Sequence, residues 1–290
     1  MDDNRINVQW FPGHMTKAKR MMAESVKLVD AVCEIIDARI PLSSRNPELG
    51  DIIGSKPRLV IMNRVDLADP EITRQWVKHF KDGGVFVMET DSRSGKGVNA
   101  FSGAVRALLK DKLEAYAAKG QANRPLRAMI AGIPNVGKST FINKVAGRKA
   151  AIASDRPGVT RGKQWISIDK GLELMDTPGL LWPRFETKEM GEHLAFTGAV
   201  KDGVVDTEAL AANMMVTLRA DYPELLKARY KLEPEPELQG WELLEKAAGK
   251  RGFLISGGEV DTERMAAILL DEFRAGKIGR ISLERPEKQA

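Results

Sequence analysis

The sequence predicts an α/β fold, a mostly parallel sheet with helices on both faces, followed by a small all-α domain. Short apolar runs alternate with helical patterns as far as Asp176, which is the signature of βαβ units. After Pro183 strand-like runs stop and amphipathic helical stretches take over. The 290 residues, 43% hydrophobic and 29% charged, are enough for one sizeable domain and a smaller one. We therefore expect domains at 1–184 and 185–290.

Each element of the first domain follows from a local pattern. Apolar runs predict buried strands at 31–37, 58–63, 85–89 and 126–132. Two more strands, 163–169 and 172–176, are expected to form a hairpin around Lys170 and Gly171. Helical periodicity predicts helices at 16–28, 70–82, 99–119 and 138–146. Pro70 suits a first helical turn, where its missing N–H costs nothing.

The second domain is expected to be entirely helical. Amphipathic patterns predict helices at 188–197, 207–219, 224–230, 238–248 and 262–275. A Glu-Pro-Glu-Pro segment, 233–236, is typical of a stiff connector.

Composition excludes several classes of protein. The longest strictly apolar run, 265–270, has six residues, whereas a membrane-spanning helix needs about 20. The first residues lack the layout of a secretory signal, and the single cysteine, Cys33, rules out an intramolecular disulfide framework. We expect a cytoplasmic protein with no membrane partner, in which Cys33 is a small buried side chain.

Basic residues concentrate in one stretch. Residues 144–170 hold seven Lys or Arg and two Asp, an excess that equals the net charge of +5 of the whole chain. Such a stretch either neutralises a bound phosphate or contacts a polyanion such as nucleic acid, and both interpretations stay open at this point.

The strongest motif is residues 132–139, Gly-Ile-Pro-Asn-Val-Gly-Lys-Ser, between a strand and a helix. Glycines let the backbone N–H groups point at phosphate oxygens, and the helix N-terminus adds positive potential. Lys138 is expected to reach the β- and γ-phosphates and to act in catalysis, and Ser139 to ligate Mg²⁺. The nucleotide contacts expected here are Asn135, Val136, Gly137, Lys138, Ser139 and Thr140.

A second motif, Asp-Thr-Pro-Gly at 176–179, ends another strand. Asp176 can hold Mg²⁺ and the Gly179 N–H can meet the γ-phosphate. Asp-x-x-Gly is also a common turn, so the motif gains its meaning from lying some forty residues after the phosphate loop.

A third motif, Asn63-Arg64-Val65-Asp66, closes the strand at 58–63 and indicates which base is bound. The Asp66 carboxylate can accept hydrogen bonds from N1–H and the exocyclic amine of guanine, which adenine does not offer in that arrangement. Arg64 stands where the Asn-Lys-x-Asp motif has lysine, and its alkyl stem can still cover the base. As an isolated tetrapeptide the motif could equally be a helix cap or turn.

Two further segments complete the expected site. Asp91-Ser92-Arg93, just past the strand at 85–89, could supply the last base contact through a backbone N–H, with Ser92 as the candidate residue. Thr160, in a Pro-Gly loop between the phosphate loop and the hairpin, is the best candidate for a switch threonine that closes over Mg²⁺ and the γ-phosphate. An ordinary exposed threonine is the alternative.

The order of these motifs is circularly permuted. A standard GTPase places the phosphate loop first, whereas here the base-reading elements precede it. In an open parallel sheet the ligand lies at the carboxyl ends of the strands, so rejoining and recutting the chain preserves the site. The cut falls after Asp176, so movement driven by the γ-phosphate could pass to the helical domain.

With this order the chain resembles the circularly permuted P-loop GTPases of the ribosome biogenesis GTPase A family. The matching parts are Trp-Phe-Pro-Gly-His-Met at 10–15, Asp-Ala-Arg-Ile-Pro at 37–41, Ser-Arg-Asn-Pro at 44–47, the permuted motifs, and Leu-Trp-Pro at 181–183. The resemblance covers nearly the whole length. It implies a GTPase domain, a helical domain that contacts ribosomal RNA, and activity stimulated by the large ribosomal subunit.

The resemblance also bears on catalysis. Many GTPases orient the attacking water with a glutamine after the Asp-x-x-Gly glycine, but Leu180 occupies that position. The family suggests His14, in a loop beside Gly13, for this role; a histidine that only fixes its own turn is the alternative. Asn135 matches the asparagine that helps hold K⁺ in potassium-activated relatives. His79 and His193, in helical stretches, are interpreted as structural.

Three functions are therefore weighed. The first is a GTP-hydrolysing factor of late 50S maturation that binds GTP, GDP, Mg²⁺ and ribosomal RNA, and is a monomer off the ribosome. Its RNA surface would combine the basic stretch with Arg264, Arg274, Lys277 and Arg280. The second is a regulatory GTPase switch that acts on a protein effector without RNA. The third, a P-loop ATPase or kinase, is disfavoured by Asp66.

Overall fold

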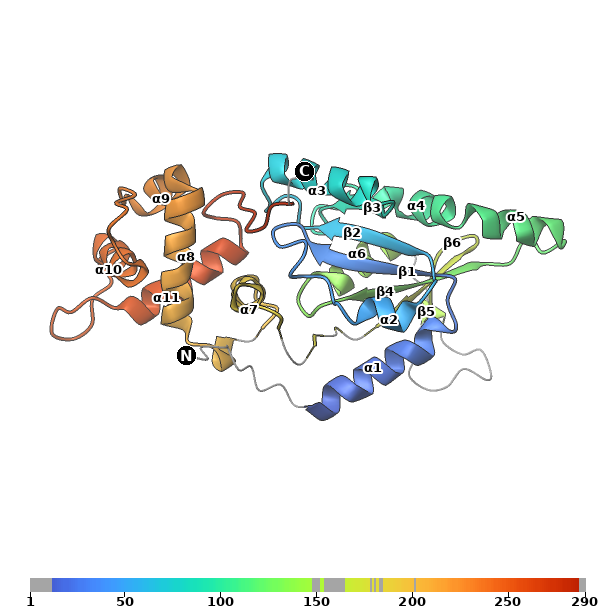
Figure 1. The fold of residues 1–290 in the computed structure, drawn as a ribbon, viewed down its shortest axis with the longest axis horizontal. Helices are drawn as coiled ribbons and strands as arrows, with labels where there is room; N and C mark the ends of the chain where they lie inside the picture. The colour runs from blue at the N-terminus through green and yellow to red at the C-terminus, as the bar shows by residue number, and fades with distance from the viewer. Residues whose placement is uncertain are drawn as a thin grey trace. The chain divides into compact units, whose positions relative to one another are not determined.

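The computed structural model describes residues 12–147, 152–153, 165–177, 179, 181–182, 185–200 and 202–286. Contacts divide these residues into two compact units (Figure 1). Among the described residues, the first unit holds 12–182 together with 284–286, and the second holds 185–283.

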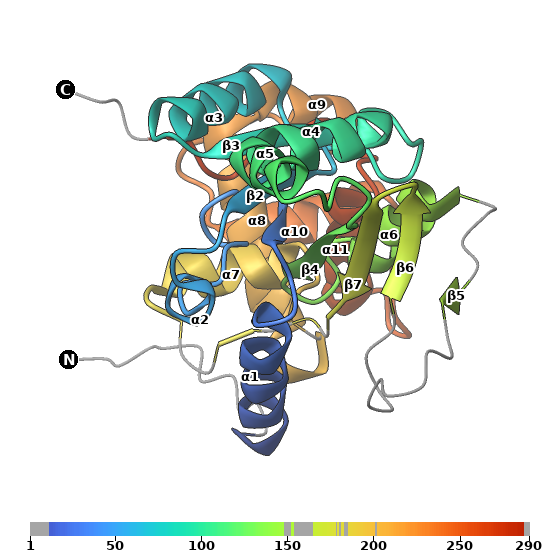
Figure 2. The same ribbon diagram turned by 90° about the vertical axis from the view of Figure 1, so that its right-hand side faces the viewer.

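The first unit is built on one sheet. Within the described residues seven strands pair in the order β3-β2-β1-β4-β7-β6-β5. Their bounds are β1 Ala31–Asp37, β2 Arg58–Asn63, β3 Phe86–Thr90, β4 Leu126–Gly132, β5 Ile152–Ala153, β6 Trp165–Asp169 and β7 Leu172–Asp176. The strands β3, β2, β1, β4 and β7 are parallel, while β6 and β5 continue the sheet antiparallel at one edge (Figure 2). The mostly parallel sheet predicted from the sequence is confirmed.

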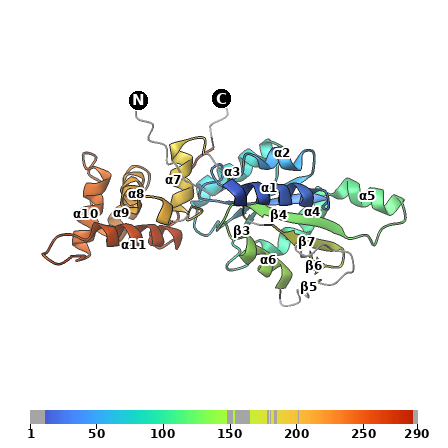
Figure 3. The ribbon, with the colours of Figure 1, turned by 90° about the horizontal axis from the view of Figure 1, so that it is seen from below.

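Helices cover both faces of this sheet (Figure 3). Their bounds are α1 Pro12–Val26, α2 Leu49–Ile53, α3 Pro70–Asp82, α4 Phe101–Leu108, α5 Lys110–Ala118 and α6 Lys138–Ala146. On one face Met22 of α1 and Leu49 of α2 pack with Val32 of β1, and α3 packs beside them through Trp76. On the other face α4 and α6 meet through Phe101 and Phe141, whose ring centroids lie 5.2 Å apart.

The register of the parallel strands brings their carboxyl ends to one edge. Asp37 of β1 lies opposite Asn63 of β2, Asn63 opposite Thr90 of β3, and Ile130 of β4 opposite Asp176 of β7. The loops that follow these strands therefore emerge side by side, where ligands bind in open α/β sheets.

Two local differences from the prediction have physical causes. α1 begins at Pro12, a residue suited to a first helical turn, rather than at residue 16. The expected helix 99–119 is divided into a 3₁₀ turn, Val98–Ala100, and the helices α4 and α5, with the last break at Leu109. Leu109 is buried while α5 buries none of its residues, so packing holds the chain only as far as that point. The short helix α2 and the two-residue strand β5 were not predicted.

The second unit is helical. Its helices are α7 Lys188–Phe196, α8 Thr207–Asp221, α9 Pro223–Tyr230, α10 Gly240–Lys250 and α11 Thr262–Arg274, with a 3₁₀ turn at Asp202–Val204. The side chains of Thr187, Asp206 and Asp261 accept first-turn N–H groups and so cap α7, α8 and α11. The central helix α8 contacts α7, α9, α10 and α11, and its Met214 and Leu218 are fully buried.

A buried carboxylate ties three parts of this unit together. Glu272 of α11 accepts hydrogen bonds from Tyr230 Oη at 2.9 Å, Arg229 Nε at 3.1 Å and both terminal nitrogens of Arg251 at 3.0 Å. Burial by itself raises the pKa of Glu272, but these hydrogen bonds outweigh it and lower the pKa to about 2.

The chain returns to the first unit at Glu284. The Glu284 carboxylate accepts the Leu42 N–H at 2.6 Å and the Ser43 N–H at 3.0 Å, and its carbonyl oxygen accepts Trp76 Nε1 at 3.0 Å. We call these contacts the C-terminal clasp. The sequence-based boundaries assign all of 185–290 to the helical domain, and nothing in the pattern of residues indicated the clasp.

None of the helices in the described part of the chain is long and apolar enough to cross a membrane.

Candidate nucleotide site

The loop between β4 and α6 is shaped by two glycines. Gly132 and Gly137 have φ of 153° and 100°, in the left-handed half of the map. A Cβ on Gly132 would lie 2.6 Å from the Ile35 carbonyl oxygen, and one on Gly137 would lie 2.5 Å from Asn63 Nδ2. Both positions therefore require glycine.

Gly137 also begins α6. The first-turn N–H groups of an α-helix lack intrahelical partners, and with the helix dipole they attract anions. In α6 these groups belong to Lys138, Ser139 and Thr140. Ser139 and Thr140 are exposed, so the loop and helix start together offer a phosphate cradle.

The Lys138 side chain is buried beneath this loop. Its Nζ donates to the carbonyl oxygens of Gly132 at 3.2 Å and Ile133 at 2.8 Å. Burial lowers the pKa of Lys138 to about 8, although the charge of Asp176 acts in the opposite direction.

The Asp-x-x-Gly segment packs against the phosphate loop. Thr177 Oγ1 donates to the Ile130 carbonyl oxygen at 2.5 Å, which holds the segment to β4. A Cβ on Gly179 would lie 3.0 Å from two backbone atoms of Pro134 and 2.9 Å from Lys138 Nζ, so a larger residue here would require the phosphate loop to shift. Burial raises the pKa of the Asp176 carboxyl, and the positive charge of Lys138 offsets only part of this increase.

The structure also joins the base-reading segment to the phosphate loop. Asn63 Nδ2 donates to the Val136 carbonyl oxygen at 2.9 Å. Asn63 Oδ1 accepts from Thr90 Oγ1 at 3.2 Å and from both the hydroxyl and the N–H of Ser92, at 2.7 and 3.1 Å. Asn63 is only 2% exposed, so these bonds fix its position.

The segment Asp91-Ser92-Arg93, from which a base contact through a backbone N–H was predicted, lies beside Asn63. The N–H of Ser92 is donated to Asn63 Oδ1. Ser92 is buried and supports Asn63. The neighbouring N–H groups of Arg93 and Ser94 donate to the Asp91 carboxylate at 2.9 and 3.1 Å, which closes the turn.

In the base-reading loop the Arg64 side chain contacts the phosphate loop and strand β1, whereas the Asp66 side chain is exposed. Arg64 has φ 62°, and its guanidinium donates to the Asn135 carbonyl oxygen and pairs with Asp37 at 3.4 Å. Asp66 is exposed, as a base-binding carboxylate must be. Partial burial, followed by the negative charge of Asp91, raises the pKa of Asp66.

The residues present fit the Mg²⁺ ion of a bound nucleotide. Mg²⁺ usually takes one or two carboxylates, keeps several waters and is otherwise held by phosphate oxygens. The Asp176 carboxylate and the Ser139 hydroxyl match that requirement, beside a cradle whose glycines leave no room for a Cβ. Among the described residues there is no cluster of three or more His, Cys, Asp or Glu that would bind a metal without a nucleotide.

Some predicted residues lie outside this geometry. Thr160 and Leu180 fall outside the described residues. His14 was expected in a loop, but its backbone lies in the first turn of α1; its side chain is not among those described. The rings of His79 and Trp76 meet edge to face, with their centroids 5.3 Å apart. His193 is 7% exposed within α7.

Comparison with known proteins then identifies the family. Residues 127–225, which begin in β4, match the family described as 50S ribosome-binding GTPase. Ribosome biogenesis GTPase A of Priestia megaterium is 46% identical over 284 residues, covering 98% of each chain. The protein of the same name from Bacillus cereus is 45% identical over 281 residues, covering 97% of this chain and 95% of that one. The chain belongs to the ribosome biogenesis GTPase A family.

A solved structure agrees with this assignment. The crystal structure of GNP-bound YlqF from T. maritima has a TM-score of 0.65 and 30% sequence identity, covering 93% of this chain and 99% of that one. The circularly permuted P-loop GTPase fold with an appended helical unit is thereby confirmed, and the chain is a GTP-hydrolysing enzyme of the ribosome biogenesis GTPase A family.

The family motifs at 37–41 and 44–47 lie close to ion pairs and hydrogen bonds that could not be predicted from the sequence. Glu34 of β1 is fully buried and pairs with Arg58 and, at 3.4 Å, with Arg45. Asn46 Oδ1 accepts the Glu48 N–H at 2.9 Å and so leads into α2. The charged residues at 37–47 had no pattern that predicted these pairs, because each depends on a partner brought close only by the fold.

Proposed function

We propose that this chain is a GTP-hydrolysing assembly factor of late large-subunit maturation that works in the cytoplasm and binds ribosomal RNA in its GTP state. The main support for the nucleotide site comes from two hydrogen bonds. Asn63 donates to the Val136 carbonyl oxygen, and Arg64 donates to the Asn135 carbonyl oxygen. These bonds bring the base-reading segment and the phosphate loop, far apart in sequence, into one site. The names of the relatives support the ribosomal role.

Each residue of the site has a chemical task in this proposal. Asp66 accepts the guanine N1–H and amine, and the N–H groups at the start of α6 together with Lys138 hold the phosphates. Ser139, Asp176 and Thr160 would hold Mg²⁺, which when bound neutralises phosphate charge. The Asn135 side chain would hold K⁺, in a loop where its own φ of 57° turns the backbone.

The RNA-binding surface is expected to use basic residues from both units. Arg264, Lys277 and Arg280 are exposed, and the Arg264 guanidinium lies 4.4 Å from the centre of the Phe253 ring. Arg274 does not belong to this set, because it pairs with Asp202 at 2.6 Å and donates to the Phe196 carbonyl oxygen at 3.0 Å. Most of the basic stretch at 144–170 lies outside the described residues.

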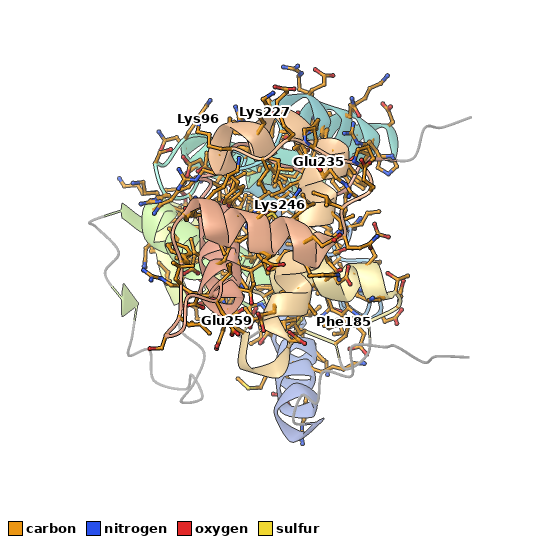
Figure 4. The ribbon with its side chains drawn as sticks, turned by 90° about the vertical axis from the view of Figure 1, so that its left-hand side faces the viewer. Lys96, Phe185, Lys227, Glu235, Lys246 and Glu259 are labelled. Carbon is orange, nitrogen blue, oxygen red and sulfur yellow. The ribbon has the colours of Figure 1, made fainter. Side chains whose placement is uncertain are left out.

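Other basic residues of the helical unit are paired with acids. Lys246 Nζ lies 3.2 Å from Glu235 Oε1, and both residues are labelled in Figure 4; Lys227 Nζ lies 2.9 Å from Glu233 Oε2. Such exposed pairs lower the net positive charge of their surface, so we centre the RNA contact of the helical unit on Arg264 and Lys277.

The test is nucleotide-dependent sedimentation with purified large ribosomal subunits. The protein should co-sediment with the large subunits when a non-hydrolysable GTP analogue is present, and should not co-sediment with them when GDP is present. The subunits should also raise its GTPase rate. Arg264→Glu should weaken co-sedimentation, and Lys246→Glu is the matched charge reversal at a paired lysine. If the GTPase rate is not raised and the analogue does not promote co-sedimentation, the assembly role is refuted. A partner complex that survives ribonuclease would instead identify a protein effector.

His14 is proposed to orient the attacking water, since Leu180 has no group able to do so. We expect His14→Ala to bind GTP with unchanged affinity and to lose at least about 100-fold of its ribosome-stimulated turnover. Single-turnover hydrolysis with and without large subunits measures this. Normal stimulated turnover in the variant would remove His14 from the catalytic role.

A further inference from the structure

Two residues in left-handed backbone conformations, one in the base-reading loop and one in the phosphate loop, contact each other directly. Arg64 has φ 62° and Asn135 has φ 57°. Such conformations are costly for residues other than glycine and persist where surrounding contacts hold them. Here the contact is direct, because the Arg64 guanidinium donates to the carbonyl oxygen of Asn135.

That hydrogen bond determines where an N–H group points. The carbonyl of Asn135 and the N–H of Val136 belong to one planar trans peptide and point in opposite directions. In the same way, the hydrogen bond from Asn63 to the Val136 carbonyl orients the N–H of Gly137. Side chains of the base-reading loop thus aim two consecutive N–H groups of the phosphate loop away from themselves.

The position of Arg64 is itself held by a residue of strand β1. Asp37, at the end of β1, lies 3.4 Å from the Arg64 guanidinium. The Asp37 carboxylate is locked by Arg39, which donates its backbone N–H and Nε to Oδ1 at 3.0 Å each and Nη2 to Oδ2 at 2.8 Å. The side chains of Arg39 and Asp37 are 1% and 2% exposed.

We propose that Asp37, locked by Arg39, is a positioning residue that holds the Arg64 guanidinium on the Asn135 peptide and so presets the phosphate loop for the nucleotide. The inference rests on the proposed nucleotide site and extends it to a residue at the end of β1 that has no assigned role in binding the nucleotide.

An arginine suits this task and a lysine does not. The planar guanidinium carries five N–H donors in a rigid fork, so Nη1 of Arg64 faces Asp37 while Nη2 reaches Asn135. A lysine ammonium is a compact point charge on a flexible stem. At position 64, where the Asn-Lys-x-Asp motif has lysine, the arginine of this chain can therefore reach Asp37 and the Asn135 carbonyl at the same time.

The same strand offers a matched control. Glu34 of β1 is also a fully buried carboxylate shared by two arginines, Arg45 and Arg58. Glu34→Gln therefore removes a buried negative charge three residues from Asp37, as Asp37→Asn does. The two arginines that pair with Glu34 belong neither to the base-reading loop nor to the phosphate loop, so this variant serves as the control.

The experiment measures the release rate of a fluorescent GDP analogue from the full chain. We compare wild type, Asp37→Asn, Arg64→Lys, the double variant and Glu34→Gln, with thermal unfolding measured in parallel. Asp37→Asn and Arg64→Lys are each expected to speed release about tenfold, and the double variant no more than either single one, because both changes break one linkage. Glu34→Gln is expected to lower the melting temperature while release stays within about twofold of wild type.

Specific outcomes would overturn the proposal. Release at the wild-type rate from folded Asp37→Asn would do so, and so would effects of the two substitutions that multiply. If Asp37→Asn does not fold, Arg64→Lys decides, since its partly exposed side chain leaves the Asp37–Arg39 pair intact; wild-type release from this variant refutes the inference. A wild-type chain that fails to bind GDP would refute the nucleotide site itself.

Discussion

The ammonium group of Lys138 is buried, and burial disfavours its charged form. The affinity for nucleotide should therefore depend on pH. Burial lowers the pKa of Lys138 to about 8 from an ordinary value near 10.5. A phosphate beside the ammonium favours the charged form, so nucleotide binding should take up a proton when the pH is above about 8. We expect the affinity for GDP to be constant below about pH 7 and to fall by up to about tenfold per pH unit above pH 8.

Titration of a fluorescent GDP analogue from about pH 6.5 to 9 checks this. Lys138→Arg, whose guanidinium stays charged, should lose the dependence in this range. The effect on stability has the opposite sign. Because the folded pKa is lowered, the unfolded chain binds more protons between about pH 8 and 10.5, and the cost of burying the ammonium disappears as the pH rises through that window. An affinity that stays constant to pH 9 would contradict the lowered pKa.

Asp66 is expected to decide the base. Asp66→Asn keeps one acceptor for the guanine N1–H but places an N–H donor opposite the exocyclic amine, so GTP affinity should fall by about 100-fold or more. Xanthosine triphosphate, which has a carbonyl oxygen in place of that amine, is then favoured. Competition binding with the two nucleotides measures the change. Asp69→Asn is the control three residues away: Asp69 caps α3 through the Glu71 and Ile72 N–H groups, and asparagine caps equally well. Equal preference for GTP in both variants would show that Asp66 does not read the base.

Among the elements, α10 shows how closely two helices can pack. A Cβ on Gly240, at the start of α10, would lie 2.2 Å from the Ala212 carbonyl oxygen of α8. Gly240→Ala should therefore destabilise the helical unit by about 2 kcal/mol, since backbone cannot move aside cheaply. A Cβ on Gly249 in the same helix would meet nothing within 4 Å, and Gly249→Ala should stabilise the helix by up to about 1 kcal/mol.

Urea unfolding followed by circular dichroism measures both changes. Nucleotide affinity should stay the same in the two variants, because neither position belongs to the site. If Gly240→Ala is as stable as Gly249→Ala, the two helices can separate at this contact without cost.

The elements predicted best are those whose signal is local. Strands β1, β2 and β4 were predicted with the bounds observed, because strands in the middle of a parallel sheet are buried on both faces and are mostly apolar in sequence. The bounds of β7 were also predicted, from the hairpin turn at Lys170 and Gly171. The phosphate loop was predicted because its glycines and lysine are required at fixed spacing. The role of Asp37 was not, since a charge at the end of a strand acquires meaning only from Arg64, brought beside it by tertiary structure. Thr160 stays a prediction.

At the scale of the whole molecule, the permuted chain enters and leaves the helical unit from the GTPase unit. The chain crosses from the first unit to the second just after the Asp-x-x-Gly segment and crosses back at Glu284. One crossing thus follows the residues that sense the γ-phosphate in the proposed mechanism. The other ends in the C-terminal clasp, at the loop between β1 and α2 that begins directly after Asp37, the partner of Arg64.

The clasp should therefore contribute to the stability of the GTPase unit although it lies near the end of the chain. Truncation after Leu283 removes the carboxylate that accepts the Leu42 and Ser43 N–H groups and the carbonyl that accepts Trp76 Nε1. The Trp76 side chain is 1% exposed, so its donor would be left buried without this acceptor. Unmatched buried donors and lost charge-assisted bonds together predict a loss of about 2–4 kcal/mol.

Truncation after Pro286 is the matched control, because it shortens the chain but keeps Glu284. Thermal unfolding should separate the two truncations by several degrees, and amide hydrogen exchange at Leu42 and Ser43 should be faster only in the shorter chain. Equal melting temperatures and equal exchange would mean that the loop between β1 and α2 holds its shape without the clasp. In that case the second crossing of the chain would carry no mechanical link to the nucleotide site.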